Sequence, residues 1–224
     1  MTATTPEFLY VQVPAPGPDA AALAVAGAAV ERSGGELLAC ASAADVELLE
    51  PGTPAAAVLI ARWSGRAAFD AAWGGAAGAA VAGRAAGVPG ALVLAAEGLP
   101  PEGLPDQLEV PTTASVPIAA LATLPTYMAI QGSVTDAERI VGYRDIILPM
   151  MIEREALYVV FCIGGSGIRV LHGSWDEQIY AISRWPTHAS AHDFWYSERY
   201  QTVAIPIRTG IGSFDVHLLR GRAG

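Results

Sequence analysis

Hydrophobic and polar positions in the C-terminal half of the chain alternate between the spacings of strands and of helices. Residues 126–131 and 157–162 are apolar runs of the length expected for buried strands. Between them, residues 135–156 are typical of a helix with a Thr135–Glu138 capping box at its start. The pattern then predicts a helix that begins at 186–189 and further strands over 168–173, 178–185 and 213–219.

The first half repeats this order of elements with more Ala and Gly. A single offset of 122 residues aligns four anchors: Trp63 with Trp185, Trp73 with Trp195, Cys40 with Cys162, and residues 46–50 with 168–172. Because separate anchors rarely agree on one offset by chance, we interpret the chain as an internal duplication.

A proline-rich stretch separates the two repeats. Residues 99–125 contain six prolines, which favour extended backbone and cannot donate a hydrogen bond to a sheet. The sequence therefore predicts an N-terminal unit over 1–98, a linker over 99–125 and a C-terminal unit over 126–224.

The predicted strands suggest how the two units pack. Segments such as 55–62 and 157–162 are apolar at successive positions, so both faces of their sheets need an apolar partner. Helices can cover one face, and the other sheet can cover the second. We therefore predict an α+β protein of two tandem ferredoxin-like βαββαβ units whose antiparallel sheets pack face to face.

Composition excludes several classes of function. All 13 basic residues are arginine, so lysine Schiff-base chemistry and a P-loop lysine are absent. The net charge of −9 argues against nucleic acid or a membrane as a partner. Cys40 and Cys162 lack a nearby partner in the sequence, and residues 1–8 do not resemble a signal peptide. These features predict a cytoplasmic protein with free thiols.

The segments 34–52 and 170–201, "GGELLACASAADVELLEPG" and "VLHGSWDEQIYAISRWPTHASAHDFWYSERYQ", resemble the dimeric α+β barrel superfamily. They are similar to the domain family of unknown function DUF1330, and the resemblance extends over nearly the whole chain apart from the linker. The tandem form also resembles antibiotic-biosynthesis monooxygenases, and more narrowly the oxygenases that open the B ring of angucyclines of the jadomycin, gilvocarcin and kinamycin type.

This resemblance implies an oxygenase of antibiotic biosynthesis that acts on an electron-rich polycyclic aromatic polyketide, a phenol or a hydroquinone. It implies O2 as cosubstrate and no tightly bound cofactor, with reduced flavin supplied by a separate reductase for the ring-opening type. We also expect a homodimer. Two alternatives stay open: a cofactor-free polyketide cyclase or isomerase, and a non-catalytic barrel that binds a small molecule.

All four histidines lie in the second half, which favours that half as the site of chemistry. His188 and His192 share a helix face, but the Glu of an HExxH motif is missing, so we predict no metal site. His192 is one candidate base, and His217, two residues from Asp215, is the other; each is equally compatible with a structural role.

Other candidates come from the aromatic and arginine positions. Arg208 is the candidate for stabilising a phenolate. A flat substrate needs rigid walls. The residues predicted to bind it, several of which are equally typical of a core, are His172, Trp175, Arg184, Trp185, His188, Phe194, Trp195 and Tyr196.

Overall fold

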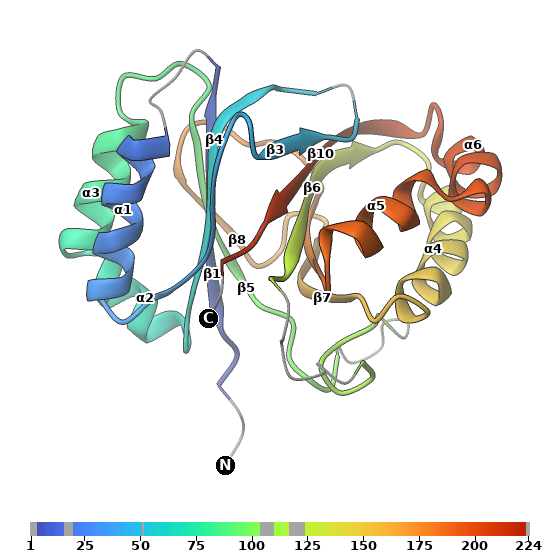
Figure 1. The fold of residues 1–224 in the computed structure, drawn as a ribbon, viewed down its shortest axis with the longest axis horizontal. Helices are drawn as coiled ribbons and strands as arrows, with labels where there is room; N and C mark the ends of the chain where they lie inside the picture. Colours follow the sequence, from blue (N-terminus) through green and yellow to red (C-terminus); the bar gives the residue numbers. More distant parts are fainter. Residues whose placement is uncertain (1–3, 16–19, 51, 104–109, 117–123, 223–224) are drawn as a thin grey trace.

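The computed structural model describes residues 4–15, 20–50, 52–103, 110–116 and 124–222. It has four layers: helices, a five-stranded sheet, a second five-stranded sheet, and helices (Figure 1). Both sheets are antiparallel, and their inner faces pack on each other. The predicted α+β architecture of two tandem ferredoxin-like units is confirmed.

The first sheet has the strand order β2-β4-β1-β5-β8, and α1, α2 and α3 cover its outer face (Figure 1). The bounds in this half are β1 Glu7–Pro14, α1 Ala20–Arg32, β2 Glu36–Ser42, β3 Val46–Leu48, β4 Ala55–Trp63, α2 Arg66–Trp73, α3 Ala76–Ala85 and β5 Leu92–Glu97.

The second sheet has the order β3-β10-β6-β9-β7, and α4, α5 and α6 cover its outer face (Figure 1). The bounds here are β6 Thr126–Val134, α4 Ala137–Ile152, β7 Leu157–Ile163, β8 Ile168–His172, β9 Ile179–Trp185, α5 His188–Tyr196, the π-helical turn η1 Tyr200–Ala204, α6 Ile205–Arg208 and β10 Gly212–Arg220.

The two halves exchange one short strand each. β3 of the first half pairs with β10, where Leu48 lies opposite His217. β8 of the second half pairs with β5, where His172 lies opposite Val93. Each exchanged strand satisfies backbone groups at the edge of the other half's sheet, so the two halves are joined by hydrogen bonds as well as by apolar packing.

The offset of 122 holds for β4 and β9 and for the starts of the helices α2 and α5 that follow them, but not for the cysteines. β4 and β9 align at that offset, whereas pairing places Cys40 opposite Leu59 and Cys162 opposite Tyr180. Cys40 therefore packs on the helix side of its sheet and Cys162 on the inner side. The equivalence of the two cysteines is wrong, because a one-residue shift moves a strand side chain to the opposite face.

Local signals place the second-half helices. α4 begins after Asp136, whose carboxylate accepts a hydrogen bond from the Arg139 amide at 3.0 Å, so the Thr135 capping box is wrong. The Thr135 hydroxyl donates instead to the carbonyl oxygen of Ile211. α5 begins after Thr187, which forms a reciprocal capping box with Ser190.

The described part of the proline-rich segment has no helix or strand and packs on the second half. The Leu99 amide donates to the Val159 carbonyl at 2.8 Å, and the Tyr158 amide donates to that of Pro111 at 2.9 Å. Residues 104–109 and 117–123 lie outside the described residues, and the predicted unit boundaries stay a prediction. No helix in the described ranges is long and apolar enough to cross a lipid bilayer.

Candidate functional site

A cavity of about 460 Å³ lies between the outer face of the second sheet and its helices. Strands β6, β7 and β9 form one wall, and α4, α5 and α6 form the other. Four of its lining residues are exposed and mark the mouth: Ala137, Ile163, Gly164 and Gln178. This volume is within the range of small-molecule sites, which is about 300–1,000 Å³.

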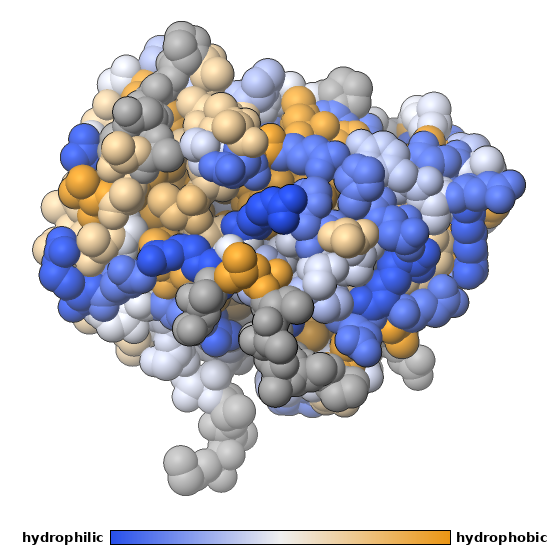
Figure 2. All heavy atoms as spheres, viewed as in Figure 1, coloured by the Kyte–Doolittle hydropathy of each residue, from blue (hydrophilic) through white to orange (hydrophobic). Residues whose placement is uncertain are grey.

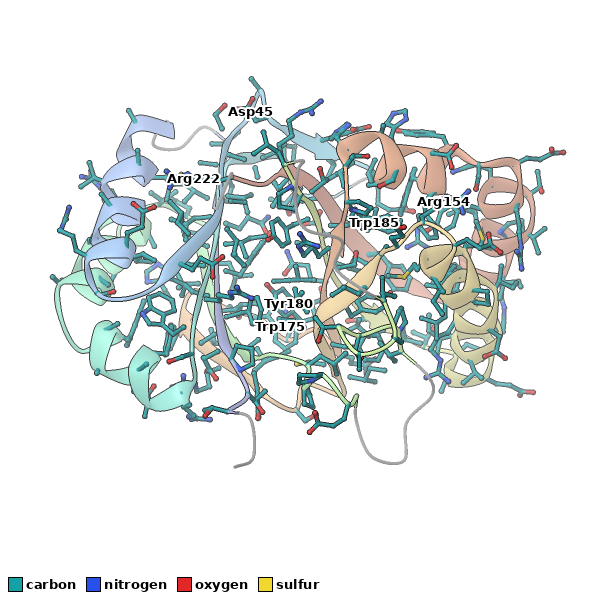
Figure 3. The ribbon with its side chains drawn as sticks, turned by 60° about the horizontal axis from the view of Figure 1, so that its bottom comes forward. Asp45, Arg154, Trp175, Tyr180, Trp185 and Arg222 are labelled. Carbon is teal, nitrogen blue, oxygen red and sulfur yellow. The ribbon has the colours of Figure 1, made fainter. Side chains whose placement is uncertain are left out.

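The alternation of β9 explains which aromatic side chains reach this space. Ala181, Ser183 and Trp185 face the helices and line the cavity, whereas Tyr180 packs between the sheets. Figure 3 shows Trp185 on the helix side and Tyr180 nearer the centre of the molecule. The Trp185 indole N–H donates to the Ser183 hydroxyl at 2.9 Å, so this buried polar group is satisfied within the wall.

Three tyrosines bring hydroxyl groups to the cavity: Tyr143, Tyr158 and Tyr200. The hydroxyl oxygens of Tyr143 and Tyr200 are 2.8 Å apart and form a hydrogen bond. Burial raises the pKa of all three well above the ordinary value for tyrosine. These side chains therefore stay protonated at neutral pH and can donate hydrogen bonds to a ligand, but they do not act as bases there.

Arg208 supplies a buried positive charge at the cavity wall. Its guanidinium carbon lies 4.7 Å from the ring centre of Phe214, 5.4 Å from that of Trp195 and 5.5 Å from that of Tyr143. The side chain is 6% exposed, and burial lowers its pKa to about 10, so it stays charged at neutral pH.

The partner of Arg208 is Glu50, which comes from the first half. The guanidinium Nη2 donates to a Glu50 carboxylate oxygen. Glu50 follows the exchanged strand β3 by two residues, so the strand exchange brings this carboxylate to the second half. A carboxylate of one repeat thus pairs with an arginine that lines the cavity of the other.

Four of the predicted site residues line this cavity: Trp185, Phe194, Trp195 and Arg208. Arg184, the neighbour of Trp185 on β9, points the other way and is buried opposite Tyr127 between the sheets. The alternation of β9 separates these neighbours, which the sequence analysis had grouped as one surface.

His188, His192 and Tyr196 form a separate cluster at the surface of α5. They gather around Glu47 of β3, with nitrogen–oxygen distances of 3.4 Å from His188 and 3.7 Å from His192. The Tyr196 hydroxyl donates to Glu47 at 3.3 Å. Partial burial, followed by the charge of Arg220, lowers the pKa of His188. Among the described residues, no group of His, Cys, Asp and Glu is arranged to hold a metal ion.

His217 lies between the sheets in a buried polar network. Its Nδ1 is 3.3 Å from the Tyr10 hydroxyl, and its Nε2 is 3.1 Å from the Thr53 carbonyl oxygen. Tyr10 donates to Gln12 at 3.0 Å, and Gln12 accepts from Gln131 at 2.7 Å. The network joins the two halves across their inner faces. Both ring nitrogens of His217 contact protein atoms, and the residue is 1% exposed.

The two remaining candidates lie away from the cavity. His172 is at the end of β8, in the first sheet. Trp175 packs against the core between the sheets, and its indole nitrogen is buried without a hydrogen-bond partner. The sequence patterns did not predict the cavity residues Tyr143, Tyr158, Tyr200, Ser183 and Arg144, nor Glu50, the partner of Arg208. The spacing of apolar residues along α4 is the signal that could have identified the inward face of that helix.

Two solved structures share the fold over nearly their whole length. One is a candidate monooxygenase from Lactobacillus acidophilus NCFM, at 13% identity and a TM-score of 0.51, covering 96% of this chain and 93% of that one. The other is a candidate monooxygenase from Fusobacterium nucleatum subsp. nucleatum ATCC 25586, at 8% identity and a TM-score of 0.51, covering 99% and 94%. At these identities the likeness concerns the fold.

A weaker likeness involves an anthrone oxidase-like protein, at 10% identity and a TM-score of 0.43, covering 100% of this chain and 94% of that one. That score is too low to support an inference. No curated protein sequence matches the chain. The C-terminal repeat is similar to a known family: residues 125–222 match the domain of unknown function DUF1330.

Proposed function

We propose that the protein is an oxygenase that binds a planar, electron-rich aromatic molecule in the cavity of its second half and oxidises it with O2. The observation that carries this proposal is the cavity itself. It has aromatic walls, a few hydroxyl donors and a buried guanidinium. A polycyclic phenol or hydroquinone of the polyketide type fits these features, since its rings can stack and its oxygens can accept hydrogen bonds.

The proposed reaction needs no reductant when a methylene group is oxidised to a ketone. The substrate CH2 group loses four electrons, one oxygen atom of O2 becomes the ketone oxygen, and the other leaves as water. Cleavage of an angucycline-type ring is the finer form of the proposal. There, one oxygen atom is inserted into a C–C bond, and reduced flavin from a separate reductase supplies the two electrons that turn the other into water.

The role of the protein is to favour the phenolate form of the substrate, which gives up electrons most readily. Tyr143 and Tyr200 offer a hydroxyl donor, and Arg208 adds a guanidinium whose charge is reduced by its pair with Glu50, in a site with mostly apolar walls. His192 and His217 do not line the cavity. The proton of the phenol therefore leaves to solvent in this scheme, and neither histidine is used as the base.

One observation favours a second candidate, a non-catalytic carrier of the same ligand. Among the described residues that line the cavity, none is Asp, Glu, His or Cys. A cyclase or isomerase would need a base there, so this composition argues against that alternative. It does not distinguish a carrier from an oxygenase whose substrate supplies the electrons, and the fold is compatible with either.

Oxygen uptake with 1,8-dihydroxyanthrone separates these functions. We expect one O2 consumed per ketone formed, at a rate above autoxidation, with one labelled oxygen atom from 18O2 in the product. Tyr143→Phe and Tyr200→Phe should each lower the rate by roughly 10- to 100-fold, because one hydroxyl of the pair donates to the developing charge and the other donates to that hydroxyl. Tyr196→Phe is the matched control, since its hydroxyl contacts Glu47 outside the cavity.

Ligand binding without oxygen uptake would identify a carrier. Conversion of the ligand without oxygen uptake would identify a cyclase or isomerase. Either result contradicts the oxygenase proposal.

A further inference from the structure

Arg144 occupies a position on α4 that the helical pattern reserves for apolar side chains. Ala137, Ile140, Ile147 and Met151 line the cavity at spacings of three, four and seven residues, and Arg144 lies in the same stripe. A charged residue in the apolar stripe of a helix loses hydration on one side. Such a position is unfavourable unless a partner compensates for that loss.

No such partner is present in the part of the chain that the structure describes. The Arg144 Nε is buried without a hydrogen bond, and its guanidinium forms none of the ion pairs found among the described residues. Arg208, on the same cavity, differs: Glu50 neutralises it, and three aromatic rings surround it. Arg144 is also half-buried rather than enclosed, so a ligand in the cavity can reach it.

We propose that Arg144 is an anion subsite of the cavity and that the natural ligand is an aromatic carboxylic acid. The inference rests on the proposed function for the aromatic part of the ligand and adds the carboxylate. The rings would lie between β9 and α4, and the carboxylate would accept hydrogen bonds from the Arg144 guanidinium. A guanidinium presents paired N–H donors that match the two oxygens of a carboxylate.

The charges favour a single carboxylate over a phosphate group. Arg144 and Arg208 are the two cationic residues that line the cavity in the described chain, and Glu50 already pairs with Arg208. One uncompensated positive charge suits a monoanion. The protein carries a net charge of −9, which repels polyanions at long range and leaves binding of an anion to a local cation.

Calorimetric titration with anthracene-2-carboxylic acid and anthracene-2-carboxamide tests the subsite, because the two probes share rings and differ in charge. We expect the wild type to bind the acid about tenfold more tightly, the ratio that corresponds to one good charge-assisted contact. In Arg144→Met the acid should bind no better than the amide, while affinity for the amide stays the same. Arg144→Lys should keep part of the preference.

Arg66→Met is the matched control. It removes the same charge from an exposed position on α2 of the first half and should keep the full preference for the acid. Unchanged binding of the amide shows that Arg144→Met is folded. Equal affinity of the wild type for both probes, or a preference that survives Arg144→Met, overturns the subsite.

The two proposals fail separately. Acid-selective binding without oxygen uptake would contradict the oxygenase and leave the subsite intact. Oxidation of the neutral anthrone together with equal binding of the acid and the amide would contradict the subsite and leave the oxygenase intact.

Discussion

The two halves of the molecule share one framework but use the space between sheet and helices differently. In the first half, Phe69 fills this space, with its ring 5.1 Å from that of Trp63 and 6.0 Å from that of Trp73. At the offset of 122, Phe69 corresponds to Ala191 and Leu59 to Ala181. The second half thus has smaller side chains at two positions that the first half fills.

The second half also has more polar side chains than the first half around this space. Tyr158 of β7 and Leu37 of β2 lie at equivalent points of their strand pairs, each beside a register shift. In the view of Figure 2, apolar residues gather over α1 and α3, and hydrophilic residues gather over the helices of the second half. The duplication therefore kept one repeat as an apolar support and gave the other repeat a cavity with polar groups.

The ion pairs offer the largest contrast between the halves. Glu50→Ala should destabilise the protein by about 3 kcal/mol, because it leaves the buried Arg208 charge uncompensated. Urea unfolding measures this. The control is Glu36→Ala, which breaks the exposed Glu36–Arg62 pair of the first half and should cost less than about 1 kcal/mol. Equal costs would contradict the view that Glu50 and Arg208 form a buried functional pair.

The second test gives one cavity position the larger side chain that the first half has at the equivalent position. Ala181→Leu restores the side chain found at Leu59 and should occupy space that the ligand needs. We expect binding of anthracene-2-carboxamide to weaken by roughly 10-fold, with the thermal midpoint unchanged or raised. Leu59→Ala in the first half should leave ligand binding unchanged and lower stability. Full ligand affinity in Ala181→Leu would place the ligand elsewhere.

The two equivalent tryptophans differ in whether their indole N–H is satisfied. Trp185 donates to Ser183, whereas the buried Trp63 indole nitrogen, on the strand that carries Ala61, has no hydrogen-bond partner among the described residues. Ser183→Ala should therefore cost about 1 kcal/mol of stability in urea unfolding. Ala61→Ser should recover a part of that amount in the first half. No loss in Ser183→Ala would mean that the hydrogen bond contributes nothing net.

The smallest expected effect concerns His188, whose counterpart at the same offset is Arg66. The pKa of His188 is lowered by burial, so the unfolded chain binds this proton more readily than the folded chain. The contribution of His188 to stability therefore decreases as the pH falls through 6.5. NMR titration should give a His188 pKa below that value, and His188→Gln should flatten this slope below roughly pH 7. A pKa above 6.5 would contradict the assignment to burial.

Much of the fold follows from local patterns. The repeated Trp63 and Trp185 lie at the ends of β4 and β9, and the helices after them begin 122 residues apart. The register of β2 and the exchange of β3 and β8 were not predictable from these patterns. A β-bulge adds one residue to a strand without altering the apolar run around it, and pairing across the two sheets joins residues distant in sequence.

The sequence says less about which residues meet at the cavity than about the fold. The aromatic residues Trp185, Phe194 and Trp195 are predicted as walls for a flat substrate, although both tryptophans recur in the first repeat, and Arg208 is predicted from its place near the last strand. His217 and Arg184 were grouped with them, although their side chains lie between the sheets. Residue type indicates what a side chain can do, but the face of the strand determines which partners it meets.

The sequence by itself determined the duplication, the α+β class and the repeat that holds the polar residues, because repeated spacing and composition are properties of the chain. The tertiary structure alone decided which of those residues meet. It separated the histidines from the cavity, brought Glu50 of one half to Arg208 of the other, and left Arg144 facing the cavity without a partner among the described residues. These relations depend on strand register and on the exchange between sheets, which arise only when distant segments pack together.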